Sequence, residues 1–280
     1  KIKIKIKKSI LITGCSSGIG FNAAIELRKR NWRVLATCRQ RSDCAKLISE
    51  GLETFPLDLS DEKSIIDAVA KVKDKTSGSL DAIFNNGAFM LPGAVEDLKR
   101  NAIREIFEVN VFGQIDLTNR CLPLLLKSQD PRVVNSSSVL GFASLPYRGA
   151  YNATKFALEA FTDAFRREHL NEIIKFILIE PGPISTKIRE NAIPRFEKWI
   201  DWENSRRRAF YEKILIKRLY NPSQKKDRFE QTPLHVTKKL IHALESSNPR
   251  ARYFVTKPTY VASLITRLLP TKLQDLLLKY

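Results

Sequence analysis

Residues 13–20 read Thr-Gly-Cys-Ser-Ser-Gly-Ile-Gly, and the expected fold follows from this stretch. It ends a short apolar run, Ser9–Thr13, and opens a segment with helical spacing, Ile19–Arg30. The three glycines allow a tight turn, close approach of the backbone to a diphosphate, and close packing of helix on strand. A helix start also presents N–H groups and a positive dipole end to phosphates. The stretch therefore predicts a dinucleotide site, the alternative being a turn whose glycines serve packing alone.

Beyond this turn, apolar runs of strand length alternate with segments of helical spacing. We expect further strands at Arg33–Thr37, Leu52–Leu57, Asp81–Phe84, Arg132–Asn135, Ile174–Ile179 and Arg252–Thr256. We expect helices at Cys44–Glu50, Asp61–Lys73 (capped by Ser60), Val95–Leu126 with a break near Asn110–Gly113, Ala150–Leu170 and Thr232–Glu245. This alternation predicts an α/β fold, a doubly wound, Rossmann-like parallel sheet of about seven strands with helices on both faces.

The length and composition favour one domain. The chain has 280 residues, of which 43% are hydrophobic, and it contains no Gly/Ser-rich linker. We expect a single domain over residues 1–280. Within it, the long charged region 184–231 is predicted to cover the substrate as a lid, because loops of this length usually have a function. Residues 258–280 form an apolar, basic C-terminal tail that Pro270 divides.

The formal net charge of +18 favours anionic partners, among them phosphorylated cofactors, nucleic acid and acidic lipid. A solvated basic surface is the simpler interpretation. No nucleic-acid-binding module is recognisable, so no nucleic acid partner is expected.

Four scattered cysteines without a Cys-x-x-Cys pair indicate a reduced, cytoplasmic protein. The three histidines are far apart, so no metal site is expected. The N-terminus has neither the apolar core nor the cleavage site of a signal peptide, and no apolar stretch is long enough to span a bilayer. Cys15 lies in the glycine turn, where a helix start can lower a thiol pKa. A redox switch at Cys15 is thus a hypothesis, and a small buried side chain is the favoured interpretation.

The end of the second predicted strand bears on the choice of cofactor. An NAD site usually places an acid there for the ribose 2′-hydroxyl, but the sequence reads Thr37-Cys38-Arg39-Gln40-Arg41. The guanidinium of Arg39 can instead pair with a 2′-phosphate. We therefore predict NADP(H), with Arg41 able to share or replace this role. The alternative is that Arg39 is a solvated loop residue.

The glycine turn and the motifs that follow it make the chain resemble the short-chain dehydrogenase/reductase family. The resemblance is strong over residues 8–186. The chain shows the turn, Asp58, Asn85-Asn86-Gly87-Ala88, Asn110, Ser138, Tyr151-Asn152-Ala153-Thr154-Lys155, Pro181-Gly182 and Thr186 in the family's order. The overall sequence pattern is similar to that of the family branch that acts on hydrophobic alcohols, aldehydes, retinoids or steroids. One departure is Asn-Asn-Gly-Ala, where the family usually has Asn-Asn-Ala-Gly. We expect a small backbone adjustment there, without loss of cofactor binding.

The resemblance implies specific site residues. The catalytic residues would be Asn110, Ser138, Tyr151 and Lys155. Those that contact the cofactor would be Gly14, Ser16, Ser17, Gly18, Ile19, Gly20, Arg39, Asp58, Leu59, Asn86, Gly87, Tyr151, Lys155, Pro181, Gly182, Ile184 and Thr186. Family register selects Ser138 over its neighbours Ser136 and Ser137 as donor to the substrate oxygen. Asn110 would kink its helix and hold a water that links Lys155 to solvent.

The chemistry needs a hydride on carbon and a proton on oxygen. A free tyrosine has a pKa of about 10, too high for efficient transfer near neutral pH. Lys155 lies one helical turn after Tyr151, on the same face, so its charge is expected to lower the tyrosine pKa. These residues predict an oxidoreductase that interconverts a carbonyl and an alcohol.

The partner predictions are less specific. Large apolar side chains in the lid region suggest an apolar cavity with a basic rim, and hence a lipophilic carbonyl substrate. They are Phe196, Trp199, Ile200, Trp202, Phe210 and Tyr211. The resemblance implies a homodimer or homotetramer. The tail can lie peripherally on a membrane or pack on protein. A nonenzymatic NADP(H)-binding sensor or scaffold is the alternative function, since fold alone does not prove activity.

Overall fold

The computed structural model describes residues 7–221 and 229–278, which contain a seven-stranded parallel sheet. The strand order is β3-β2-β1-β4-β5-β6-β7, so the winding direction reverses between β1 and β4. The strands are β1 (Ser9–Ile12), β2 (Arg33–Cys38), β3 (Glu53–Pro56), β4 (Ala82–Asn85), β5 (Arg132–Ser136), β6 (Lys175–Glu180) and β7 (Arg252–Phe254). The predicted doubly wound sheet is confirmed.

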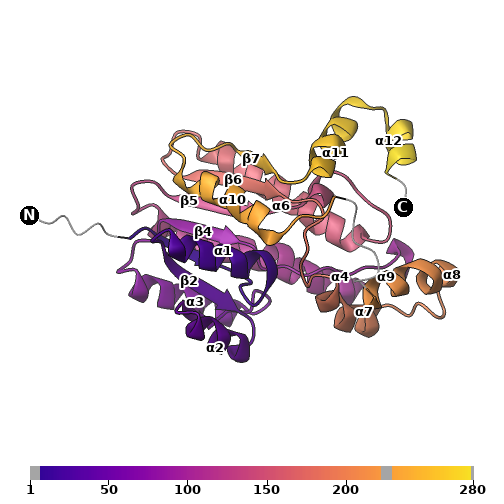
Figure 1. Cartoon of the computed structure of the whole chain (residues 1–280), viewed down its shortest axis with the longest axis horizontal. Coiled ribbons are helices and arrows are strands. Elements are labelled where there is room, and N and C mark those ends of the chain that lie inside the picture. Colours follow the sequence, from indigo (N-terminus) through magenta and orange to yellow (C-terminus); the bar gives the residue numbers. More distant parts are fainter. Residues whose placement is uncertain (1–6, 222–228, 279–280) are drawn as a thin grey trace, which may run out of the picture.

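Helices cover both faces of the sheet (Figure 1). On one face α1 packs against α10, and on the other α3 packs against α5, while α6 contacts β6. The helices are α1 (Gly18–Lys29), α2 (Arg41–Ser49), α3 (Glu62–Lys75), α4 (Arg100–Phe107), α5 (Gly113–Leu125), α6 (Gly149–Glu168) and α10 (Pro233–Glu245). The side chain of Asp61, rather than that of Ser60, caps α3 by accepting the Lys63 amide at 3.1 Å.

The strands are buried on both faces because both sides of the pleat are apolar. In β1, Ile10 and Ile12 enter the core beneath α1 and α10, whereas Leu11 enters the core beneath α3 and α5. All three side chains are fully buried. Each contributes about 1.5–3 kcal/mol relative to an exposed position. This alternation fixes the register of β1 against both neighbours.

The helical region predicted over Val95–Leu126 is divided into four parts. A short 3₁₀ turn, η1 (Val95–Asp97), precedes α4, and a π-helical turn, η2 (Glu108–Phe112), joins α4 to α5. The predicted break is therefore a widened turn around the buried Asn110, and the helical path continues through it.

The region expected to be a long loop contains several helical segments in its described part, residues 184–221 and 229–231. It contains η4 (Glu190–Ala192), α7 (Ile193–Trp199), α8 (Arg208–Phe210), the π-helical turn η5 (Tyr211–Leu215) and α9 (Ile216–Tyr220). The fully buried Phe196 and Tyr211 join an apolar core that the region shares with the segment after β4 and with the start of α6. The Tyr211 hydroxyl donates to Asp97 at 2.6 Å and accepts from the Ala94 amide at 2.7 Å. These contacts fasten the region to the segment that follows β4.

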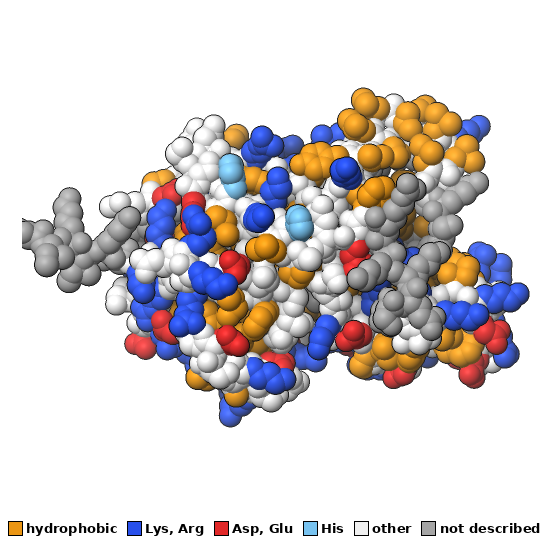
Figure 2. Space-filling view, in the orientation of Figure 1, with side chains coloured by type: hydrophobic (Ala, Val, Ile, Leu, Met, Phe, Trp, Pro, Cys, Tyr) orange, Lys and Arg blue, Asp and Glu red, His pale blue; other side chains and the backbone are white. Residues whose placement is uncertain are grey.

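The C-terminal part forms two helices, α11 (Lys257–Leu268) and α12 (Thr271–Leu277), separated at Pro270 as predicted. They project from the body of the molecule beside β7 (Figure 1). Figure 2 shows hydrophobic side chains gathered on their surface. No helix in the described part of the chain is long and apolar enough to cross a bilayer.

Candidate active site

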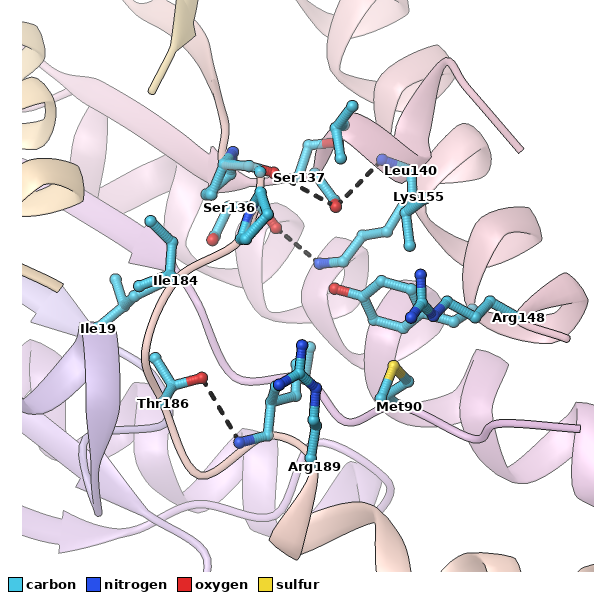
Figure 3. A pocket seen from close by; sticks show the side chains of 18 of the residues that line it. Ile19, Met90, Ser136, Ser137, Leu140, Arg148, Lys155, Ile184, Thr186 and Arg189 are labelled. Atoms are coloured by element: carbon cyan, nitrogen blue, oxygen red, sulfur yellow. Dashed lines mark hydrogen bonds between the residues drawn. The ribbon is translucent and has the colours of Figure 1, made fainter. Parts of the chain in front are cut away.

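A cavity of about 510 Å³ opens at the carboxyl ends of β4, β5 and β6, beside the glycine turn (Figure 3). It lies near the reversal of winding between β1 and β4, where open parallel sheets usually bind ligands. Its described lining includes Ile19, Asn86, Ala88, Met90, Ser136, Ser137, Ser138, Val139, Leu140, Leu145, Arg148, Tyr151, Lys155, Pro181, Gly182, Pro183, Ile184, Thr186, Ile188, Arg189, Arg218, Phe229 and Glu230.

Ser138, Tyr151 and Lys155 meet in this cavity. Ser138 follows β5 and caps the short η3 turn (Val139–Gly141), and its hydroxyl accepts the Leu140 amide at 3.1 Å. Tyr151 and Lys155 lie one turn apart on α6, and both are buried. Lys155 Nζ donates to the Ser136 carbonyl at 2.7 Å and lies 5.6 Å from the centre of the Tyr151 ring. The structure thus aims an ammonium group and a phenol into one space.

Burial has the largest effect on the pKa of both Tyr151 and Lys155. Desolvation raises the pKa of Tyr151 to about 12, although the Ser138 hydrogen bond and the charge of Arg148 act to lower it. Desolvation lowers the pKa of Lys155 to about 8, against the raising effect of Glu159. The pKa of Tyr151 is therefore raised and not lowered as the Tyr151–Lys155 spacing predicts, and the cation that acts against the rise is Arg148.

Asn110 lies behind the cavity and does not line it. Its side chain accepts the Phe89 amide at 3.0 Å, and it donates to the Phe89 carbonyl at 2.9 Å and to Thr154 Oγ1 at 3.2 Å. The π-helical turn carries this side chain, and Thr154 immediately precedes Lys155. Asn110 therefore ties the segment after β4 to the helix of the tyrosine and lysine.

The glycine turn fits a bound diphosphate. Gly14 and Gly18 adopt the left-handed backbone conformation, with φ of 70° and 60°. Residues that have a side chain rarely adopt this conformation. A Cβ on Gly20 would lie 2.3 Å from the Gly14 carbonyl oxygen, so helix and turn approach too closely for any other residue. A Cβ on Gly18 would meet the Thr186 side chain at 3.1 Å. Ser16 and Ser17 complete the turn, and Ile19 alone of residues 14–20 lines the cavity itself.

The residues expected at the adenosine end lie outside the cavity. Arg39 is exposed just after β2, and the half-buried Asp58 accepts the Ser60 amide at 2.9 Å. Leu59 is buried. Arg195, from the start of α7, lies within electrostatic reach of both Arg39 and Asp58, and it stacks on Phe89 with 3.8 Å between guanidinium and ring centre. No sequence motif singles out Arg195.

The segment Asn85-Asn86-Gly87-Ala88, which departs from the usual family sequence, is held by local contacts. The amides of Asn86 and Gly87 both donate to Thr13 Oγ1, at 2.9 and 2.8 Å. A Cβ built on Gly87 would lie 3.1 Å from the end of the Leu59 side chain, a tight contact with a flexible group. Gly87 does not have a positive φ. The backbone at Gly87 therefore does not depend on glycine for its conformation, and the expected small adjustment is consistent with this geometry.

The segment after β6 closes the cavity. Pro181, Gly182, Ile184 and Thr186 all line it, as does Asn86. A Cβ on Gly182 would lie 2.0 Å from Thr256 Oγ1, so this position requires glycine. The turn is thereby pressed against the start of α11.

A buried acidic network lies behind Lys155. Arg252 on β7 donates to Glu180 at 2.6 Å and to Asp163 at 2.7 Å, and it also contacts Glu159, one turn after Lys155. Glu180 is fully buried. Its burial, with the negative charge of Glu159, raises its pKa to about 8 despite Arg252. Sequence reasoning missed this network because its members come from three separate elements.

One other expectation was wrong. The large apolar side chains of the lid do not line the cavity but pack into a core shared with the segment after β4 and with α6: Phe196, Trp199, Ile200, Trp202, Phe210 and Tyr211. Cys15 is a small buried side chain, the interpretation that the sequence favours, and complete burial raises the pKa of its thiol well above the ordinary value. The Cys15 thiol donates to the Ile12 carbonyl at 3.3 Å. All four cysteines are buried and unbonded. Among the described residues, no group of three His, Cys, Asp or Glu side chains could hold a metal.

Comparisons with known proteins agree on one family. A family model described as short chain dehydrogenase matches residues 8–195. The chain is 38% identical over 274 residues to the uncharacterized oxidoreductase YbbO of Escherichia coli K12, covering 98% of this chain and 95% of YbbO. It is 34% identical over 279 residues to retinol dehydrogenase 16 of Mus musculus, covering 97% of this chain and 87% of that protein.

Solved structures share the fold. A short-chain dehydrogenase from Streptomyces avermitilis has a TM-score of 0.76 and 26% identity, covering 92% of this chain and 91% of that one. ElxO with NADP bound has a TM-score of 0.70 and 25% identity, covering 89% and 97%. A Burkholderia phymatum family member in complex with NAD has a TM-score of 0.77 and 22% identity, covering 97% and 95%, and supports the fold alone.

The Glu180 carboxyl generates a prediction on stability. A carboxyl with a raised pKa favours folding below its unfolded pKa of about 4.3, and this contribution is lost as the pH rises toward 8. Glu180→Gln stays neutral, so from about pH 5 to 8 the wild type should lose on the order of 1–3 kcal/mol more unfolding free energy than the variant. Urea unfolding at several pH values measures this difference. Glu203→Gln, at an exposed position, is the control, and equal pH slopes for Glu180→Gln and the wild type would contradict the prediction.

Proposed function

Because the chain belongs to the short-chain dehydrogenase/reductase family, a family of oxidoreductases, we propose that it is an NADP(H)-dependent enzyme that interconverts a lipophilic aldehyde or ketone and its alcohol. The observation that carries this proposal is the meeting of Ser138, Tyr151 and Lys155 in one cavity beside the glycine turn. A binding protein without activity would not need an acid, a donor and a cation aimed at the same space.

In this proposal the residues divide the work of proton transfer. The bound nicotinamide supplies or accepts the hydride. Ser138 donates a hydrogen bond to the substrate oxygen, and Tyr151 gives that oxygen its proton in reduction or removes it in oxidation. The charge of Arg148 favours the tyrosinate, and the Lys155 ammonium, held by the Ser136 carbonyl, lies beside the tyrosine ring and would contact the cofactor. Asn110 positions the Phe89 backbone and Thr154 behind the lysine, and a water held near it would complete the relay to solvent.

The cofactor would lie along the carboxyl edge of the sheet. The glycine turn, with the start of α1, would hold the diphosphate. Asp58, Leu59 and Gly87 would contact the adenosine end, and Ile184 with Thr186 the carboxamide. Arg39 would pair with the 2′-phosphate, since the residues directly after β2 include no acid. The ElxO structure contains NADP and the Burkholderia one NAD, so the preference rests on Arg39.

The substrate proposal rests on the apolar cavity wall. Met90, Leu140, Leu145 and Ile188 face the same space as Tyr151. The region 184–231 would cover the substrate, because Ile184, Arg189 and Arg218 from it line the cavity. The similarity to a retinol dehydrogenase fits a lipophilic alcohol or aldehyde.

We place this enzyme in the cytoplasm, as a homodimer or homotetramer with a tail in peripheral contact with a membrane. The tail helices expose Leu264, Leu268 and Leu276 by 59%, 73% and 57%. Arg267 and Lys272 flank these leucines, so the surface combines apolar area with positive charge. Such a surface suits an acidic bilayer.

Tyr151→Phe tests the enzyme directly. NADPH oxidation with a panel of aliphatic, aromatic, retinoid and steroid carbonyls should fall by about 10²–10⁴-fold in this variant, because the general acid is removed. Tyr220→Phe removes a hydroxyl that donates to Glu197 in the lid and should keep wild-type rates. Tight NADPH binding without turnover of any carbonyl would favour the sensor or scaffold alternative.

Arg39→Ser tests the cofactor preference. Loss of the charge-assisted hydrogen bonds to a 2′-phosphate should raise KM for NADPH about tenfold, while KM for NADH changes little. Steady-state kinetics with both cofactors measure this selectivity. Arg41→Ser is the matched variant and should have the smaller effect. An effect confined to Arg41→Ser would move the role to that residue, and unchanged selectivity in both variants would contradict the proposal.

Vesicle flotation tests the tail. The protein should float with phosphatidylserine-containing vesicles and less with phosphatidylcholine alone, because charge and apolar area act together. Leu268→Asp combined with Leu276→Asp should abolish flotation. Ile48→Asp, on α2 and 60% exposed, removes an equally exposed apolar side chain elsewhere and should float normally. Equal flotation of the double variant and the wild type would exclude the tail as the contact.

A further inference from the structure

Arg252 is the centre of the buried network behind the cavity. It donates through Nη1 to Glu180 at 2.6 Å and through Nη2 to Asp163 at 2.7 Å, and Nη1 also contacts Glu159. Asp163 has a second cationic partner in Arg166, at 3.1 Å. The contacts in this cluster thus set two guanidinium groups against three carboxyl groups.

Burial divides the three carboxyl groups into two kinds. Glu159 and Glu180 are buried, and desolvation raises the pKa of both, to about 8 for Glu180. A hydrogen bond between these two groups acts to raise the pKa of Glu180 and to lower that of Glu159. The half-buried Asp163 has a lowered pKa, because its two arginine partners outweigh the effect of burial. Near neutral pH, Glu180 therefore keeps a proton and Glu159 carries the negative charge of the pair.

The Glu159 side chain lies next to the wall of the cavity. A Cβ built on Gly141 would lie 2.6 Å from Ser137 Oγ and 3.0 Å from Glu159 Oε1, so these two oxygen atoms border the same point. Both atoms are buried, and neither has a hydrogen-bond partner in the described part of the chain. Ser137 itself lines the cavity. One side chain therefore stands between the Glu159 carboxylate and the cavity.

Lys155 reaches the same strand end from the same helix. Lys155 and Glu159 lie one turn apart on α6, and both are buried. The Lys155 ammonium donates to the carbonyl of Ser136, the residue directly before Ser137 (Figure 3). Desolvation lowers the pKa of Lys155 to about 8, and the charge of Glu159 acts against this effect. The carboxylate therefore helps the buried amine to keep its proton.

The other titratable or charged groups around this pair do not replace Glu159. They are Tyr151 and Arg148 at the cavity, and Arg252, Glu180 and Asp163 in the network. Burial raises the pKa of Tyr151 to about 12, so its phenol is neutral where Lys155 titrates. Arg148 acts on Tyr151, and the network groups are joined through Arg252. Glu159 is thus the link between the network and the lysine.

We propose that Glu159 is a positioning residue that keeps the Lys155 ammonium charged for cofactor binding and proton transfer, while Arg252 and Glu180 hold its carboxylate in place. The part that concerns proton transfer rests on the proposed function. The effect of Glu159 on the lysine can be measured by cofactor binding alone.

The pH dependence of NADPH affinity tests this role without turnover. Lys155 would contact the cofactor, so the affinity should fall as the pH rises through about 8, where the ammonium loses its proton. In Glu159→Gln a neutral amide no longer favours the ammonium, so the midpoint of this fall should lie about one pH unit lower. Nicotinamide fluorescence gives Kd from pH 6 to 10. Equal midpoints in the variant and the wild type would overturn the inference.

Asp163→Asn is the matched control. It also removes a carboxylate from Arg252, but the charge of Asp163 is not among those that act on Lys155, so the wild-type midpoint should remain. Glu159→Asp keeps the charge and should have a midpoint closer to the wild type than Glu159→Gln. A merely structural role would lower the melting temperature without moving the midpoint. An equal shift in Asp163→Asn and Glu159→Gln would also overturn the inference.

Two further variants address folding and compensation. Glu159→Met removes the same charge and leaves Arg252 with two carboxyl partners, so it should fold and shift the midpoint even if Glu159→Gln does not fold. Glu180 can ionise once residue 159 is neutral, so Glu159→Gln is also combined with Glu180→Gln. The double variant should shift the midpoint at least as far as Glu159→Gln alone, and a wild-type midpoint there would overturn the inference.

Kinetics separate failure of this role from failure of the proposed function. With decanal and NADPH, kcat/KM should decline at lower pH in Glu159→Gln than in the wild type. A shifted binding midpoint without turnover of any carbonyl supports the effect of Glu159 on Lys155 and contradicts the proposed reaction. Turnover with the same pH profile in both proteins overturns the role of Glu159 and leaves the proposed function standing.

Discussion

The close approach of backbone to backbone at the carboxyl end of β1 is the constraint on which the rest of the site depends. The Gly14 carbonyl lies where a side chain on Gly20 would be, and Gly14 itself lies against Gly87, which follows β4. The turn, the start of α1 and the end of β4 therefore form one compact unit. Thr186, which lines the cavity, packs against Gly18 of this unit.

Burial of charge is the second organising feature. Lys155 is a buried ammonium with one short carbonyl contact, and Glu159 follows it on the same helix. Glu159 in turn shares Arg252 with Glu180, so the lysine lies at the edge of a partly neutralised network. Desolvation raises the pKa of the buried tyrosine and lowers that of the buried lysine. The tyrosine and lysine that we propose to act in catalysis are thereby held in an environment where small changes in charge have large effects.

The lid region is fastened to the rest of the molecule by a shared apolar core. Phe196 and Tyr211 pack in one cluster with Phe89, from the segment after β4, and with Tyr151 of α6. Arg189 and Arg218 of the same region line the cavity. A region with a charged composition therefore contributes both to the core beside the cavity and to the cavity wall.

The alternation of strands and helices, the glycine turn, and the pairing of Tyr151 with Lys155 were all predictable from the sequence. These features depend on local spacing: apolar strand runs, glycine at fixed intervals, and two residues one helical turn apart. The order of motifs along strand ends also placed Ser138 beside them, because parallel strands bring their carboxyl ends to one edge.

Only the tertiary structure decided what surrounds that site. The core that the lid region shares with the segment after β4, the cavity positions of Arg148, Arg189 and Arg218, and the Glu180–Arg252 contact join residues far apart in the chain. The pKa directions of Tyr151 and Cys15 likewise depend on burial, which is set by packing from several elements at once and cannot be read from neighbours in sequence.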